Sequence, residues 1–280
     1  MTGRERPVIG FLTDFGLDGA AATCRGVMLG ICRDAQIVDI CHTVTKYAIR
    51  DGAFILRSAL PYLPIGVHVG VVDPGVGTER RAIAIRCARG DVLVGPDNGL
   101  LPPAAEALGG VSEARELTNP GLWLPGAASA TFHGRDIFAP VAAHLAAGDA
   151  ELAAVGPTVP LDDLVRLPDP RRTVRPGALE TEATYVDSFG NVRLAAGGAD
   201  LAAAFADVEP GQRLLVTIGD AAPLTMALAD TFGSAAQGAA IVYVDSSGNV
   251  ALAVRQGDFA HEHQVSAGAA VRIGEADDSG

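Results

Sequence analysis

The chain has a single lysine and no long apolar run, and each shortage excludes a class of protein. Lys46 is the only lysine among 21 basic residues and follows a threonine, which excludes a phosphate-binding loop of the GxxxxGK[ST] type. No apolar segment approaches the roughly 18 residues that span a bilayer. The apolar run near the amino end is too short for the core of a signal peptide. We therefore expect a soluble cytoplasmic protein with no membrane partner.

Motifs that bind metals or activate common nucleophiles are also missing. The four cysteines form no CxxC pair, which favours reduced thiols over disulfides or a zinc site. The sequence contains no GxSxG or HExxH, so a typical serine hydrolase or zinc protease is not indicated. His261 and His263 form an HxH pair with no third ligand nearby. We expect no metal and no cofactor.

Acidic residues outnumber basic ones, and the formal net charge of the 280 residues is −12. A surface of this charge repels phosphate backbones, so we expect no nucleic-acid partner. Apolar residues make up 49% of the chain, which is enough to build a substantial core. The length fits one large domain or two of ordinary size.

The first part of the chain alternates strand and helix patterns. Short β-branched apolar runs at 7–12, 36–41 and 66–72 are typical of strands buried on both faces. Helix-like apolar spacing lies between them, at 20–34 and 48–61. Further on, two strand-like runs flank a three-residue turn and predict a hairpin over 82–96. The sequence predicts an α/β sheet domain over residues 1–160.

The second part of the chain has a different pattern. Five prolines fall within 157–177, which predicts an extended linker over 161–177. Apolar–polar alternation follows and predicts a smaller β-rich domain over 178–280. Within it, YVDSFGNVRL (185–194) and YVDSSGNVAL (243–252) match at eight of ten positions. They predict two hairpins with the same turn chemistry, and both turns could also face one ligand.

Two glycine-containing loops follow predicted strands, where open α/β sheets bind ligands. They are TDFG at 13–16 and DPGVGTERR at 73–81. Asp14 could accept hydrogen bonds from both hydroxyls of a ribose, or could instead cap the following helix. His133 precedes a helical pattern and could be structural or functional.

Six motifs in one order carry a resemblance to a known family. They are TDFG (13–16), DPGVGTERR (73–81), PDNGLL (96–101), TFHGRD (131–136), DSFGN (187–191) and DSSGN (245–249). The sequence resembles the S-adenosyl-L-methionine (SAM) hydrolases, or hydroxide adenosyltransferases, which are related to the 5′-fluorinase and 5′-chlorinase. The resemblance implies an N-terminal α/β domain, a C-terminal β-barrel-like domain, and a homotrimer. The substrate would lie between the N-terminal domain of one subunit and the C-terminal domain of its neighbour.

The resemblance also implies how the nucleophile is handled. Asp73, Arg80 and His133 would act on a water that attacks C5′ of SAM, giving adenosine and L-methionine. The halogenases lack this set, and the insertion that the fluorinase carries is missing here, where ARG at 88–90 joins two strands directly. The implied function is a SAM hydrolase. The alternatives are a chlorinase-like 5′-halogenase and a non-catalytic SAM-binding protein.

The resemblance further implies a set of substrate-binding residues, each for one part of SAM. They are Asp14 for the ribose hydroxyls, Tyr47 and Phe132 for the walls around ribose and base, Phe189 and Asn191 for adenine, Asp18 and Asp187 for the ammonium, and Ser246 and Ser247 for the carboxylate. Tyr47 stands where the fluorinase has Trp, and Ser247 where it has Arg. The segment 17–20 is one residue shorter than in many members.

Overall fold

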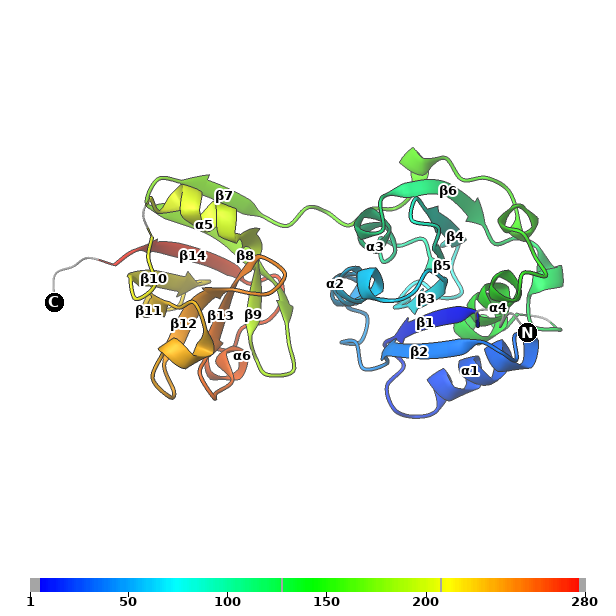
Figure 1. Ribbon diagram of the computed structural model, residues 1–280, viewed down its shortest axis with the longest axis horizontal. Helices are drawn as coiled ribbons and strands as arrows, with labels where there is room; N and C mark the ends of the chain where they lie inside the picture. Colours follow the sequence, from blue (N-terminus) through cyan, green and yellow to red (C-terminus); the bar gives the residue numbers. More distant parts are fainter. Residues whose placement is uncertain (1–5, 127, 207, 277–280) are drawn as a thin grey trace, which may run out of the picture. The chain divides into compact units, whose positions relative to one another are not determined.

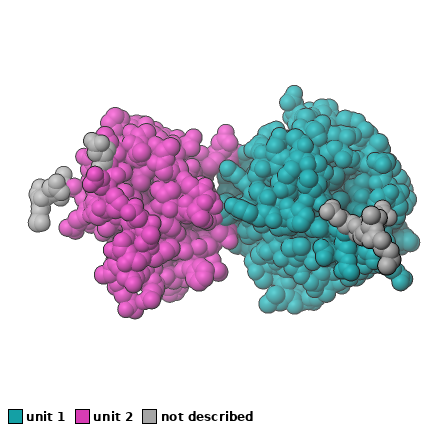
Figure 2. Space-filling view, viewed as in Figure 1, with its two compact units in different colours: residues 1–167 teal, residues 168–280 magenta. Residues whose placement is uncertain are grey.

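The computed structural model describes residues 6–126, 128–206 and 208–276 (Figure 1). The chain divides into two compact units, residues 1–167 and 168–280 (Figure 2). The hydrophobic cores of the two units are separate: two lie in unit 1 and one large core lies in unit 2.

Unit 1 contains a sheet in the order β2-β1-β3-β5-β4-β6. Its strands are β1 (Val8–Thr13), β2 (Gln36–Cys41), β3 (Val67–Val71), β4 (Ala82–Cys87), β5 (Val92–Pro96) and β6 (Val111–Glu116). β2, β1, β3 and β5 are parallel, and β4 runs antiparallel to β5 and β6. The predicted hairpin over 82–96 is therefore confirmed.

Helices cover both faces of this sheet and form two cores with it. On one face lie α1 (Ala20–Ile31) and α4 (Ala139–Ala147), which pack against each other; on the other lie α2 (Ile49–Ala59) and α3 (Pro102–Ala107). Phe11 of β1 belongs to the first core and its neighbour Leu12 to the second, as the two-residue period of a strand requires. The α/β sheet domain is confirmed.

One strand differs from its prediction. The run at 36–41 was expected to be buried on both faces, but Gln36, Val38 and Asp39 are exposed. The reason is position: β2 is one of the two edge strands of the sheet and has a neighbour on one side only. An apolar run does not reveal which strand lies at the edge.

Unit 2 is a closed β-barrel beside a short extra strand. The barrel order is β14-β10-β11-β12-β13-β9-β8, and pairing of β14 with β8 closes it. Its strands are β8 (Ala178–Val186), β9 (Val192–Gly197), β10 (Arg213–Ile218), β11 (Leu224–Leu228), β12 (Ala240–Val244), β13 (Asn249–Val254) and β14 (Ala270–Glu275). Two short helices, α5 (Gly198–Ala204) and α6 (Phe259–Glu262), pack against it. The β-barrel-like second domain is confirmed.

The segment between sheet and barrel carries some regular structure. β7 (Arg172–Arg175), within the stretch expected as a linker, pairs with β8.

Single turns of 3₁₀ helix occur elsewhere in both units, at Leu60–Tyr62, Pro120–Leu122, Leu152–Val155, Leu161–Asp163 and Phe232–Ser234. No helix of the described residues is long and apolar enough to cross a bilayer.

Candidate active site

Two acidic side chains emerge from neighbouring strands at the same edge of the unit 1 sheet. Asp14 follows β1, and Asp73 lies two residues beyond β3. The two strands are parallel and in register, with Thr13 opposite Val71. The amide of Asp14 extends this pairing by donating to the carbonyl of Val71 at 3.3 Å. The carboxyl ends of parallel strands are where open α/β sheets bind ligands.

Asp73 holds the guanidinium of Arg80 in a fixed orientation. Arg80 donates from Nε to Asp73 Oδ1 at 3.2 Å and from Nη2 to Asp73 Oδ2 at 2.5 Å. The side chains are only 8% and 5% exposed, respectively. The guanidinium also lies 5.4 Å from the ring centroid of Phe138 and donates to the carbonyl of Arg81. A paired, fork-like contact of this kind fixes direction as well as position.

His133 completes the cluster. Arg80 Nη2 also donates to His133 Nδ1 at 3.1 Å. Because a guanidinium cannot accept a hydrogen bond, Nδ1 is the acceptor, and the proton of the neutral ring is on Nε2. Burial, followed by the nearby positive charge of Arg80, lowers the pKa of His133 below its ordinary value. The neutral ring therefore presents an N–H donor at Nε2.

Backbone packing brings the loop before His133 against the loop that carries Asp73. Gly77 has φ +77°, and a Cβ there would lie 2.3 Å from the carbonyl oxygen of Ala130. Only glycine permits both the conformation and the contact. His133 then leads into a π-helical turn, Gly134–Phe138, which continues directly as α4. Such turns are frequent at functional sites.

Several motif residues that had no role assigned from sequence prove to be structural. Both Nε and Nη2 of Arg81 donate to Asp97 Oδ2, at 2.9 and 2.6 Å. Asn98 Nδ2 donates to the carbonyl of Val72 at 2.9 Å. This bond fixes the backbone immediately before Asp73. Their presence in the DPGVGTERR and PDNGLL motifs was the available sequence signal.

Asp14, expected to bind the ribose hydroxyls, lies beside Tyr47, expected to flank the ribose and base. Asp14 Oδ2 accepts a hydrogen bond from the amide of Tyr47 at 3.0 Å. The backbone of Tyr47 has φ +66°, and the residue is 70% exposed. The N-cap of α1 is Gly19, so the alternative of Asp14 as a helix cap is wrong. Asp18 is exposed in the same loop.

Two aromatic side chains near this cluster pack against each other and against the core. The rings of Phe15 and Phe132 meet edge to face, with centroids 5.7 Å apart. The guanidinium of Arg135 lies 5.0 Å from the centroid of Phe132 and donates to Asp136. A Cβ at Gly134 would lie 2.8 Å from Cζ of Phe15, so a larger residue there would have to displace the Phe15 ring.

The remaining expected residues are in the barrel. In the turn between β8 and β9, Asp187 Oδ1 accepts from the amides of Phe189 and Asn191, both at 2.9 Å. Asp187 Oδ2 accepts from Asn191 Nδ2 at 2.8 Å. Three of the lone pairs of Asp187 are thus used within its own turn, while the Phe189 ring is exposed.

The second copy of the repeat, residues 243–252, folds in the same way. Asp245 Oδ1 accepts from the amides of Ser247 and Asn249, at 2.7 and 3.1 Å. Ser246 and Ser247 are exposed at the tip. Arg193, the second residue of β9, donates from Nε to Oδ2 of Asp245 and so links the start of β9 to this second turn. The two hairpins are confirmed.

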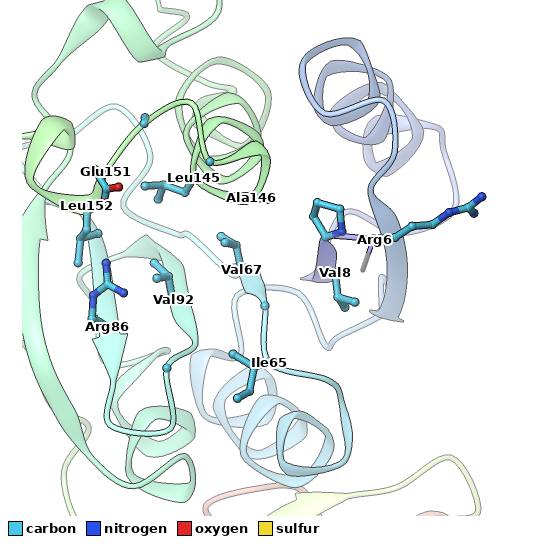
Figure 3. A pocket seen from close by; sticks show the side chains of 15 residues that line it. Arg6, Val8, Ile65, Val67, Arg86, Val92, Leu145, Ala146, Glu151 and Leu152 are labelled. Carbon is cyan, nitrogen blue, oxygen red and sulfur yellow. The ribbon is translucent and has the colours of Figure 1, made fainter. Parts of the chain in front are cut away.

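A cavity of about 440 Å³ lies at the amino ends of the parallel strands of unit 1, opposite the ends that carry Asp14 and Asp73 (Figure 3). Val8, Val67 and Val92, the first residues of β1, β3 and β5, line it, with Arg86 and Glu151 at its side. Because Asp14 and Asp73 follow the carboxyl ends of β1 and β3, this cavity is separate from their cluster. No group of three or more potential metal ligands occurs in the described residues.

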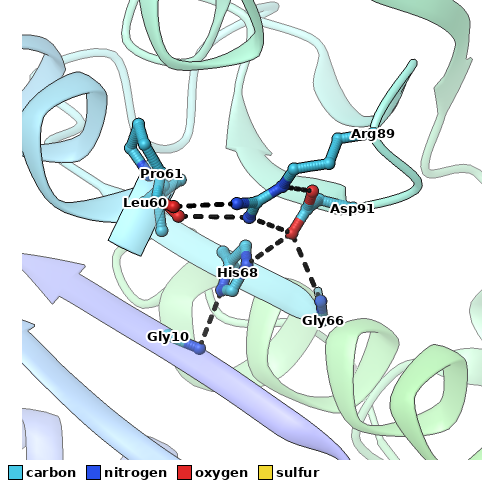
Figure 4. A network of polar contacts seen from close by, with 7 residues as sticks. All are labelled: Gly10, Leu60, Pro61, Gly66, His68, Arg89 and Asp91. Carbon is cyan, nitrogen blue, oxygen red and sulfur yellow. Dashed lines mark hydrogen bonds and ion pairs between the residues drawn. The ribbon is translucent and has the colours of Figure 1, made fainter. Parts of the chain in front are cut away.

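A buried polar network also lies toward the amino ends of these strands (Figure 4). His68 Nε2 donates to Asp91 Oδ1 at 3.0 Å, and His68 Nδ1 accepts from the amide of Gly10 at 3.1 Å. Arg89 donates twice to the Asp91 carboxylate and also to the carbonyls of Leu60 and Pro61. Burial alone would raise the pKa of Asp91, but the hydrogen bonds from His68 and Arg89 hold it well below its ordinary value.

Comparison with known proteins gives matches along both units. Residues 9–156 match the SAM hydroxide adenosyltransferase N-terminal domain, and residues 181–272 match the C-terminal domain of the same family. The chain is 48% identical to a protein of Salinispora arenicola (strain CNS-205) named (R)-S-adenosyl-L-methionine hydrolase, over 95% of this chain and 97% of that protein. A protein of Salinispora tropica with the same name is 50% identical, with coverage of 95% and 97%.

Fluorinases are more distant from this chain. The fluorinase of Actinopolyspora mzabensis is 31% identical, over 96% of this chain and 97% of that protein. Among solved structures, an uncharacterized conserved protein from Thermotoga maritima superposes with a TM-score of 0.86 at 35% identity, covering 95% of this chain and 100% of its own.

Proposed function

The chain belongs to the SAM hydroxide adenosyltransferase family, and from this premise we propose that it hydrolyses SAM to adenosine and L-methionine. The observation that carries the proposal is the buried array of Asp73, Arg80 and His133 at the carboxyl edge of the sheet. A protein that only binds SAM has no need of such an array. The greater distance of the fluorinases also disfavours a halogenase.

Hydrolysis of SAM requires activation of the attacking water rather than of the leaving group. Methionine departs from C5′ as a neutral thioether, so the leaving group needs no proton. Water must instead be held in line with the C5′–S bond and must lose a proton as the C5′–O bond forms. The oxygen keeps one hydrogen, which becomes part of the 5′-hydroxyl of adenosine.

The three residues can divide these tasks. Arg80, oriented by Asp73, and the Nε2–H of His133 supply hydrogen-bond donors that hold the water oxygen. Because Nδ1 of His133 accepts from Arg80, the neutral ring is a donor rather than the base. The carboxylate of Asp73 is the anionic acceptor of the array, and each of its oxygens keeps a lone pair after binding Arg80. We assign the water proton to Asp73.

The substrate would be held by residues of both units. In unit 1, Asp14 would bind the ribose hydroxyls, Tyr47 and Phe132 would flank the ribose and base, and Asp18 would face the ammonium. In the barrel, Asn191 and Phe189 would contact adenine, while Ser246 and Ser247 would bind the carboxylate. Asp187 would offer the ammonium the one carboxylate lone pair that its turn leaves unused.

We further propose a cytoplasmic homotrimer that needs no cofactor. Each site would combine unit 1 of one subunit with unit 2 of the next. The implied substrate-binding residues are divided between the two units, as such a shared site would require. The names of the Salinispora relatives specify the (R) sulfonium, and we propose the same epimer for this chain.

The test is product analysis. Purified protein is incubated with SAM in chloride buffer and the products are separated by chromatography. Adenosine and methionine are expected in equal amounts, with chelator present or absent. Accumulation of 5′-chloroadenosine without adenosine would establish the halogenase alternative, and tight binding without any product would establish the binding protein.

A further inference from the structure

We infer that His42 is a positioning residue for the loop 13–16, which carries the proposed ribose-binding residue Asp14. The inference rests on the proposed function of that loop. His42 lies just beyond β2, the strand next to β1, and its side chain is 13% exposed. It has no part in the water-activating array.

His42 contacts the loop on both sides of Asp14. Its carbonyl accepts a hydrogen bond from the amide of Gly16 at 2.7 Å. Its Nδ1 lies 2.9 Å from Oγ1 of Thr13, which is completely buried. One residue thus fixes the loop through its backbone at one end and through its side chain at the other.

The partners determine where each proton lies. His42 Nε2 is 3.0 Å from Oδ1 of Asp39, and a carboxylate only accepts, so Nε2 carries the proton. Nδ1 of the neutral ring is then an acceptor. The Thr13 hydroxyl, which itself accepts from the amide of Phe15 at 3.2 Å, donates its proton to Nδ1. The Thr13 hydroxyl thus both accepts and donates, and each nitrogen of the His42 ring has a partner of the right kind.

The far end of the chain of contacts is anchored as well. Arg25 of α1 donates to Oδ2 of Asp39, so the carboxylate that orients His42 is itself held. The ring of Phe11 meets the His42 ring edge to face, with centroids 4.8 Å apart. The imidazole is therefore fixed in plane and in direction by groups on β1, β2 and α1.

The same stretch of chain also contacts Asp14 directly. The amide of Tyr47 donates to Asp14 Oδ2, so residues 42–47 hold Thr13, Asp14 and Gly16 in turn. If the His42 ring is removed, the buried hydroxyl of Thr13 loses its acceptor and the loop relaxes to find another. The Asp14 carboxylate then no longer meets a ribose diol in the right geometry.

The experiment measures binding of adenosine and 2′-deoxyadenosine by calorimetry to wild-type protein, His42→Ala and Thr13→Val. Each substitution leaves buried polar groups unpaired, and we expect about tenfold weaker binding of adenosine. Binding of 2′-deoxyadenosine, which offers Asp14 a single hydroxyl, should change much less. Thr13→Ser keeps the hydroxyl and should restore the preference for adenosine.

A double variant isolates the route through Asp14. In an Asp14→Ala background, His42→Ala should cause no additional loss of adenosine binding, because the group that it positions is gone. Melting temperatures of all variants separate this effect from unfolding. Thr13→Val, which is isosteric, provides the test if His42→Ala does not fold.

Two results would overturn the inference. One is unchanged adenosine binding in both His42→Ala and Thr13→Val; the other is an equal loss for the two nucleosides, which would mean a general structural role. In either case wild-type protein that hydrolyses SAM leaves the proposed function standing. Wild-type protein that binds no adenosine and does not hydrolyse SAM would overturn the proposed function and this inference together.

Discussion

Arg80 donates a hydrogen bond to Nδ1 of His133 across 3.1 Å, although 53 positions separate the two residues in sequence. The contact turns the histidine from a possible base into a donor, because its one proton must then be on Nε2. It also makes a charged imidazolium unfavourable beside the guanidinium.

Turnover should persist in mildly acidic buffer. Burial and Arg80 lower the pKa of His133, while Asp73 and Asp136 oppose the shift in part. The ring thus stays neutral until the pH falls below the ordinary histidine value of about 6.5. Protonation would place a second donor against Arg80 and break the array, so kcat should fall only below that pH. A pH profile of single-turnover rates checks this, and an acid limb above the ordinary value would contradict it.

Asp73→Asn, Arg80→Ala and His133→Ala should each reduce turnover far more than SAM binding. Loss of a positioned proton acceptor or donor costs about 10²–10⁴ in rate. The losses should not add, because one misplaced water disables the whole array. Single-turnover rates and calorimetry measure the two effects separately. Arg166→Ala is the control, since Arg166 forms an exposed pair with Glu106. Wild-type rates in Arg80→Ala would show that the water is bound elsewhere.

Gly77→Ala should destroy activity, because the new Cβ would collide with the carbonyl of Ala130 at 2.3 Å and separate the two catalytic loops. Gly148→Ala is a matched control. Gly148 has a similar φ of +74°, but a Cβ there meets nothing within 4 Å, so only the backbone penalty remains. The activity and melting temperature of both variants are measured, and only Gly77→Ala should lose activity. Equal behaviour of the two would mean that the contact with Ala130 is unimportant.

Asp91→Asn should lower stability without changing the active site. Removing one partner of a buried ion pair costs about 3–5 kcal/mol of unfolding free energy. The native pKa of Asp91 is lowered, so its stabilising contribution is present above the ordinary aspartate value of about 3.9 and is lost as the pH falls toward the native value. Urea unfolding at several pH values measures both effects. SAM binding at a temperature where the variant is folded should match the wild type.

Mixed subunits test whether active sites are shared. When Asp14→Ala and Asn191→Ala subunits are reassembled together, some sites receive an intact unit 1 from one subunit and an intact unit 2 from the other. Activity should then reappear. Asp14→Ala mixed with Asp73→Ala is the control, because both changes lie in unit 1 and no intact pair can form. Recovery in the control, or none in the test mixture, would contradict a shared site.

The first five strands of the sheet, the hairpin over 82–96 and the twin hairpins of the barrel could be predicted from sequence, whereas β6 (Val111–Glu116) was not. Each depends on alternation and turn residues within a few positions, which local sterics and burial control. The residues Asp73, Arg80 and His133 could likewise be selected, but only through the order of the motifs that contain them. Their types fit the chemistry before any contact is known.

Contacts between distant parts of the chain depended on the tertiary structure. The edge position of β2, the β14–β8 closure and the meeting of Gly77 with Ala130 are set by how whole elements pack. The same holds for the contact of His42 with Thr13, which lie 29 positions apart. A residue type states what a side chain can donate or accept. Which partner it receives is decided when the layers close and each buried polar group must find one.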